Sequence, residues 1–182
     1  MKKNYFKVEI VLPRVKLSRF TIKMISEKYI KWMNTSEIIE FTEQRFVKNT
    51  KIKIYNYIKD KVKSKNEFLY TINIKDKKKE WAHVGNIKIG PINFIHKTAE
   101  IGYFIGDKSL HRKGIATSAI REICKLAKNK FKLKKIIASV YANNLPSKKV
   151  LIKNSFKLEG ILKKQFVFKK KRVDKLIFGK VL

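Results

Sequence analysis

The segment from Glu100 to Ala116 reads E-I-G-Y-F-I-G-D-K-S-L-H-R-K-G-I-A and joins a strand, a basic loop and the start of a helix. Its first residues alternate apolar side chains with others, which is typical of a half-buried strand. The loop places Arg112 and Lys113 before Gly114, and a periodic apolar helix follows directly. Unpaired amides at a helix N-terminus attract negative charge, and a glycine lets a phosphate approach the backbone. The segment therefore predicts a diphosphate site between a strand and a helix.

The sequence after this loop predicts a helix, a strand, a second helix and a closing strand. Residues Thr117–Phe131 carry apolar side chains at helical spacing, with lysines largely on the other face. The β-branched run Ile136–Tyr141 has the length of a strand and suits burial in a sheet. A short helix is expected over Lys148–Asn154, with Pro146 in its first turn, and a further strand opens at Phe156.

The N-terminal half predicts a similar mixture of elements. The expected strands are Val8–Leu12 with its continuation Val15–Phe20, then Phe68–Ile74 and His83–Ile89. The expected helices are Ile25–Asn34 and Lys51–Val62. Strands and helices interleaved in this way predict a mixed α/β layer fold.

Length and composition predict one domain. A chain of 182 residues that is 44% hydrophobic can bury one substantial core, so we expect a single domain over residues 1–182. Charged residues interrupt the apolar character that an N-terminal signal peptide needs, and no segment approaches the ~18 apolar residues of a membrane span. Cys124 is the only cysteine, and His83, His96 and His111 show no metal-ligand spacing. These features predict a cytoplasmic protein that binds neither metal nor membrane.

The formal charge of +31 raises the question of nucleic acid as a partner. The cations are almost all lysines spread over the whole length, which indicates compositional bias rather than a recognition patch. The densest runs, Lys75–Lys79 and Lys169–Arg172, lie between expected strands, where solvated hairpin tips explain them. The pattern therefore argues against a dedicated nucleic-acid surface, although the charge favours encounters with anionic partners.

Residues His111–Ala116 resemble the R/Q-x-x-G-x-G/A loop of the GNAT acyl-CoA N-acyltransferases, which cradles the pyrophosphate of coenzyme A. His111 stands where that family usually has Arg or Gln. The order Asn144-x-x-Ser147, helix, then K-N-x-F-x-x-E-G at 153–160 also resembles these proteins, particularly the branch of ribosomal-protein N-terminal acetyltransferases. Ser155 stands at the glycine of the K-x-G-F that this branch commonly carries.

The resemblance implies a single GNAT-like domain of the α/β (α+β) class. Its central twisted sheet is mixed but mostly antiparallel, is flanked by helices, and is splayed at the acyl-CoA site. The implied co-substrate is acetyl-CoA, and no metal is implied. The residues implied to bind acetyl-CoA are Tyr103, Ile105, His111, Arg112, Lys113, Gly114, Ile115, Ala116, Thr117, Asn144 and Ser147.

The implied reaction is transfer of an acetyl group from CoA to an amine, which must be neutral to attack a thioester. Glu100 is the candidate base, because related enzymes often carry a glutamate where this strand begins. The alternative is an exposed carboxylate paired with a lysine. Main-chain amides around Tyr103 are expected to stabilise the tetrahedral oxyanion.

Ser147 matches the family serine that often lies near the CoA sulfur, and Asn144 matches an asparagine that contacts pantetheine or orders the turn. Both residues also suit an ordinary helix cap. Tyr141 is a further candidate acid, with packing at a strand end as the alternative.

Trp32, Glu43 and Arg45 lie in the region that commonly caps the acceptor side in this family, where packing and a surface ion pair are the alternatives. The acceptor expected is a small-molecule amine, such as a nucleotide-linked amino sugar, or a protein N-terminus. The alternative function is a non-catalytic CoA- or RNA-binding module. Either a monomer or a homodimer is compatible with the sequence.

Overall fold

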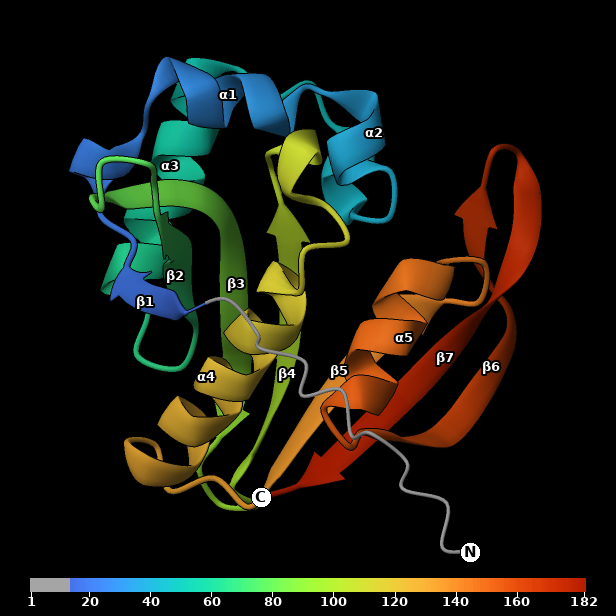
Figure 1. The fold of residues 1–182 in the computed structure, drawn as a ribbon. Coiled ribbons are helices and arrows are strands. Elements are labelled where there is room, and N and C mark those ends of the chain that lie inside the picture. Colours follow the sequence, from blue (N-terminus) through green and yellow to red (C-terminus); the bar gives the residue numbers. More distant parts are fainter. Residues whose placement is uncertain (1–13) are drawn as a thin grey trace, which may run out of the picture.

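The structure, a computed structural model, describes residues 14–182. Its centre is a seven-stranded sheet in the order β1-β2-β3-β4-β5-β7-β6 (Figure 1). The strands are β1 (Val15–Arg19), β2 (Phe68–Lys75), β3 (Trp81–Asn93), β4 (Thr98–Ile105), β5 (Lys135–Tyr141), β6 (Lys157–Phe168) and β7 (Lys171–Val181). All neighbouring strands are antiparallel except β4 and β5, which are parallel. The mixed, mostly antiparallel sheet is thus confirmed, and the strand expected over Val8–Leu12 lies outside the described residues.

Helices cover both faces of the sheet. They are α1 (Glu27–Met33), α2 (Ser36–Ile39), α3 (Lys51–Lys63), α4 (Ile115–Asn129) and α5 (Leu145–Lys153), with short 3-10 turns η1 (Ile22–Met24), η2 (Glu43–Phe46) and η3 (Lys108–Leu110). Helices α4 and α5 lie on one face, where α4 buries Ile120, Ile123 and Ala127 in the main core (Figure 1). Helices α1 and α3 build a second core, which includes Ile58. Among the described helices, none has the length and apolarity needed to span a bilayer.

Local sequence explains where these helices begin. The side chains of Ser26 and Thr50 accept hydrogen bonds from amides in the first turns of α1 and α3, as N-cap residues do. Helix α5 begins at Leu145 rather than at the expected Lys148, because Asn144 caps it and a proline occupies its first turn. The expected helix after the basic loop is confirmed as α4, shifted slightly toward the N-terminus.

Strands β4 and β5 pair only where they begin. Their register contains Thr98 with Lys135, Ala99 with Ile136, and Glu100 with Ile137. Beyond these pairs β4 stays paired with β3, and β5 stays paired with β7. Residues 101–105 of β4 and 138–141 of β5 therefore face each other without pairing, and we call this opening the splay. The predicted splay of the sheet is confirmed.

Alternation along β4 sends neighbouring side chains to opposite faces of the sheet. Tyr103 and Ile105 pack against the core beneath α4 and α5. Phe104 packs against the second core, so Glu100 and Gly102 share its face. We call the face with Tyr103 and Ile105 the α4 face, and the face with Glu100 and Phe104, which the family resemblance assigns to the acceptor, the acceptor face. The splay connects them through the sheet.

Candidate active site

The loop before α4 is shaped as an anion site. Gly114 is the N-cap of α4 and has a φ of 78°, in the left-handed region that glycine adopts without strain. The amide of Ser118 donates to the carbonyl of Gly114 at 3.0 Å, so the amides of the three preceding helical residues have no partner in the helix. Arg112 and Lys113 are exposed beside them. Backbone donors, helix dipole and side-chain charge therefore favour a bound diphosphate at this point.

His111 closes this loop onto the end of β4. Its Nε2 lies 3.0 Å from the carbonyl oxygen of Ile105. Asp107 stabilises the same connection, since its Oδ1 accepts from the amide of Ser109 at 3.0 Å and from its hydroxyl at 2.7 Å. These hydrogen bonds lower the pKa of Asp107. His111 thus has a structural contact in the loop, at the position where the family usually has Arg or Gln.

Tyr103 and Ser147 meet on the α4 face of the splay. The Tyr103 hydroxyl lies 2.9 Å from Ser147 Oγ, which joins β4 to the first turn of α5. Burial raises the pKa of Tyr103 to about 12, so the phenol stays protonated near neutral pH. Asn144 Oδ1 accepts from the Ser147 amide at 3.1 Å. Asn144 therefore caps α5 and at the same time fixes Ser147 in place.

Glu100 lies where the splay begins, on the acceptor face. Strand β3 has an irregularity between Ile89 and Ile92, so Glu100 has no register partner there and is paired only with Ile137 of β5. The side chain is half-buried, and within residues 14–182 it makes no hydrogen bond or ion pair. The lysine pairing considered as its alternative is not seen in the described part of the chain. A Cβ built on Gly102, the next residue on this face, would meet no atom within 4 Å.

At the other end of the splay, Tyr141 joins two residues of the η2 segment. Its hydroxyl donates to Glu43 Oε1 at 3.1 Å and accepts from Arg45 Nη2 at 3.1 Å. Burial and the Glu43 carboxylate raise the pKa of Tyr141. The structure thus brings Glu43 and Arg45, predicted for the acceptor side, together with Tyr141, predicted as a candidate acid, although 98 positions separate Glu43 from Tyr141.

Trp32, also predicted for the acceptor side, does not lie with Glu43 and Arg45. Its side chain is 5% exposed and belongs to the second core. A side chain at Gly106 would clash with the indole, and the Trp32 and Phe104 ring centroids are 6.5 Å apart. Trp32 therefore packs the back of β4, as the packing alternative states.

Some features of the site had little or no sequence signal. The β3 irregularity opposite Glu100 follows from Gly90-Pro91, whose proline marks a break in strand pairing. Phe166 and Phe168 alternate in β6, and their rings stack on Tyr141 and Phe41 at centroid distances of 4.0 and 5.0 Å. Alternating aromatics could have indicated a strand, but not which segment they contact.

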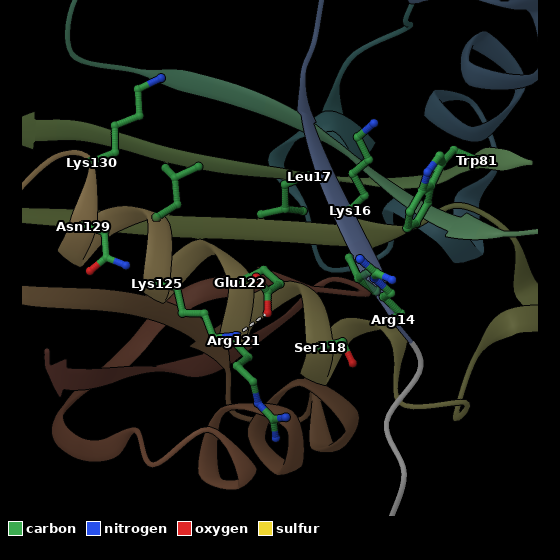
Figure 2. Close-up of a pocket in the computed structure, with 12 residues that line it drawn as sticks. Arg14, Lys16, Leu17, Trp81, Ser118, Arg121, Glu122, Lys125, Asn129 and Lys130 are labelled. Carbon is green, nitrogen blue, oxygen red and sulfur yellow. Dashed lines mark hydrogen bonds and ion pairs between the residues drawn. The ribbon is translucent and has the colours of Figure 1, made fainter.

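A separate cavity of about 740 Å³ lies between β1 and the edge of α4 away from α5 (Figure 2). Arg14, Lys16 and Lys130 are among the cations at its rim, while Leu17 and Leu126 give it an apolar part. It shares no predicted site residue with the splay. Among the described residues, no group of three potential ligands could hold a metal ion.

Two curated relatives match part of the chain. Over 68 residues the chain is 46% identical to the probable N-acetyltransferase YjcK of Bacillus subtilis (strain 168), and this aligned region covers 37% of each protein. It is 33% identical over 85 residues to a ribosomal-protein-serine acetyltransferase of Escherichia coli (strain K12), which covers 47% of each. The matched part is thus less than half the length of both relatives.

The fold has close structural neighbours. The microcin C7 self-immunity acetyltransferase MccE, solved with acetyl-CoA and AMP, superposes with a TM-score of 0.78 at 22% identity and covers 92% of each chain. The family model described as an acetyltransferase (GNAT) domain matches residues 14–157. Because this match spans well over half of the sequence, the chain belongs to the family of GNAT acetyltransferase domains.

Proposed function

We propose that this protein is an acetyl-CoA-dependent N-acetyltransferase acting on a primary amine. The observation that carries the proposal is the splay, which has an anion-binding loop at one end, a phenol–serine pair on the α4 face and a half-buried carboxylate on the acceptor face. Acetyl donor and amine acceptor approach from opposite faces and meet within the sheet.

The proposed binding site for acetyl-CoA uses backbone groups that are free at the start of α4 and along the splay. The diphosphate of acetyl-CoA is held by the first amides of α4 together with Arg112 and Lys113. Its pantetheine arm lies in the splay, where residues 101–105 of β4 and 138–141 of β5 no longer pair with each other, although each strand keeps its partner on the other side. Amide groups in that arm suit such donors and acceptors.

The acceptor side supplies the base. Glu100 accepts the proton that the amine loses as its nitrogen attacks the thioester carbonyl carbon. Main-chain amides of β4 around Tyr103 donate to the oxygen that becomes negative. When the carbon–sulfur bond breaks, the electron pair remains on sulfur.

The leaving thiolate then needs a proton, and the Tyr103–Ser147 pair is placed to supply it. The pair lies on the α4 face, 2.9 Å apart, where the sulfur of a donor lying in the splay would come. Tyr141, the other candidate acid, points to the acceptor face and already donates to Glu43. We therefore assign the proton donor to Ser147 backed by Tyr103, and a role at the acceptor side to Tyr141.

For the acceptor, two classes remain: a small-molecule amine, such as a nucleotide-linked amino sugar, and a protein N-terminus. The structural neighbour MccE was solved with AMP, a nucleotide, and the E. coli relative is named as an acetyltransferase of a ribosomal protein. A non-catalytic CoA- or RNA-binding module is the second candidate function, favoured by the charge of +31 and the basic rim of the β1–α4 cavity.

One assay separates these functions. The full chain is incubated with acetyl-CoA labelled in the acetyl group and a panel of amino sugars, nucleotide-linked amino sugars and peptide N-termini. The proposal predicts label on at least one amine and release of free CoA. Tight acetyl-CoA binding without transfer to any amine would favour the binding module.

A further inference from the structure

Arg45 is a half-buried cation whose hydrogen-bond partners are neutral oxygens and whose guanidinium lies over the rings of Phe46, Tyr141 and Phe168. It donates to the carbonyl of Glu40 at 3.0 Å, to the Tyr141 hydroxyl at 3.1 Å and to the carbonyl of Val167. Its Nε is buried and has no partner, and within residues 14–182 no carboxylate forms an ion pair with it. A charge withdrawn from water without a counter-ion is costly, so this guanidinium favours an anion beside it.

The neighbouring carboxylates have partners already. Glu40 pairs with Lys169 at 3.3 Å, and Asp174 pairs with Lys163 at 3.2 Å. Glu43 accepts from the Tyr141 hydroxyl and offsets part of the Arg45 charge through that shared phenol. Among the described residues, Glu43 is thus the one local carboxylate that offsets the cations at this end of the splay, and it does so without a direct ion pair.

Lys175 adds a second uncompensated cation. It pairs in register with Tyr141 of β5 and Leu162 of β6, so it lies beside Tyr141 on the acceptor face. Its ammonium lies 5.6 Å from the Phe166 ring centroid, and no ion pair to it occurs in the described part of the chain. The β6–β7 hairpin that carries it rises beside α2 (Figure 1). Its tip adds Lys170, Lys171 and Arg172.

The two ends of the acceptor face thus differ in charge. Glu100 lies opposite Ile137 at the closed end, and Tyr141 lies four residues further along β5 at the open end. At the rise of an extended strand this corresponds to about 13 Å. An acceptor that spans this length would present its amine to Glu100 and a different group to Arg45 and Lys175.

We propose that the acceptor carries a phosphoryl group, which binds against Arg45 and Lys175 while its amine reaches Glu100. This proposal rests on the proposed acetyl transfer. Of the two acceptor classes, it favours the nucleotide-linked amine over the protein N-terminus. A diphosphate carries about two negative charges, which several cations can hold, and the planar guanidinium matches phosphate oxygens. A free amino sugar leaves the cations at the open end without a partner.

The test compares one amine with and without its phosphate. Acetylation of a uridine-diphosphate-linked amino sugar and of the same free amino sugar is measured with the full chain and with Lys175→Gln. Lys175→Gln should raise the KM for the nucleotide-linked acceptor about tenfold, because one charge-assisted contact is lost. The kcat should stay nearly unchanged. The KM for the free sugar should change by a smaller factor.

Lys128→Gln is the matched control. Lys128 is exposed on α4, so this substitution removes the same charge at a position away from the splay. If both variants raised the KM equally, Lys175 would act only through the overall positive charge of the protein, and the proposal would be overturned. Preference for the free sugar, or for an acidic peptide N-terminus over the nucleotide-linked sugar, would overturn it too. Absence of transfer to every amine would instead refute the proposed function on which it rests.

Discussion

The hydroxyl of Tyr103 lies 2.9 Å from Ser147 Oγ and connects β4 to α5 exactly where β4 and β5 have ceased to pair. This bond is the only polar side-chain link described between these two elements, within residues 14–182. It holds a neutral phenol and a hydroxyl on the α4 face of the opening. Both the stability of the site and its chemistry should depend on it.

Removal of this phenol should reduce turnover more than donor binding. Tyr103→Phe leaves the ring in place but removes the proton donor behind Ser147, so we expect kcat to fall while acetyl-CoA affinity stays near that of the wild type. The free energy of unfolding should drop by about 1 kcal/mol, as for a lost hydrogen bond. Steady-state kinetics and isothermal calorimetry on the same preparation check this. A loss of acetyl-CoA binding with unchanged kcat would speak against a proton donor.

The same residue predicts a pH dependence of stability. Its pKa is about 12 in the folded chain and near 10 in the unfolded chain, so the folded state holds this proton more tightly. The resulting stabilisation is complete below pH 10 and is lost as the pH rises from 10 through 12. Two pKa units correspond to about 3 kcal/mol. Denaturant unfolding at several alkaline pH values should show a shallower fall for Tyr103→Phe than for the wild type. If the unfolding free energies of the wild type and of Tyr103→Phe fell equally with rising pH, the buried position of the phenol would be contradicted.

The glycine at the start of α4 should control donor affinity. Gly114 has a φ of 78°, which a branched residue adopts only with strain, and a side chain there would meet the diphosphate. Gly114→Val should weaken acetyl-CoA binding about tenfold or more, measured by calorimetry on variants shown to be folded. Gly160→Ala is the control, since a Cβ there makes only ordinary contacts at 3.8 Å. Equal acetyl-CoA affinities would remove the loop from the donor site.

Asn144 should act mainly on stability. Its side chain caps α5, so Asn144→Ala should cost about 1 kcal/mol of unfolding free energy and loosen Ser147. Asn143→Ala, at the exposed neighbouring position, should cost much less. Chemical denaturation of the two variants measures the difference. Equal costs would show that the cap contributes little.

Local signals predicted the parts of the site that lie close together in the sequence. Gly114, with basic residues before it and a periodic helix after it, was sufficient to predict an anion-binding loop. The splay came from the family resemblance, since no pattern within β4 or β5 indicates that they separate. The contact between Arg45 and Val167 spans 122 positions, and no property of either segment selects the other. Trp32 packs in the second core, and the sequence could not distinguish this role from contact with an acceptor, because both places favour an aromatic residue.

The proposed reaction depends most directly on Glu100. Its carboxylate makes no ion pair within the described residues and lies at the start of the splay, where it can take a proton from the attacking amine. Loss of a general base typically lowers the rate by ~10²–10⁴-fold. Glu122→Gln, on the outer side of α4, serves as a control carboxylate that should leave the rate unchanged.

The decisive measurement is the pH profile of kcat/KM for a true acceptor in the wild type and in Glu100→Gln, with acetyl-CoA affinity determined in parallel. The account predicts an affinity close to that of the wild type, a rate reduced ~10²-fold or more, and loss of the ascending limb that reports the base. A Glu100→Gln enzyme that acetylates its acceptor as fast as the wild type, with the same pH profile, would contradict the account.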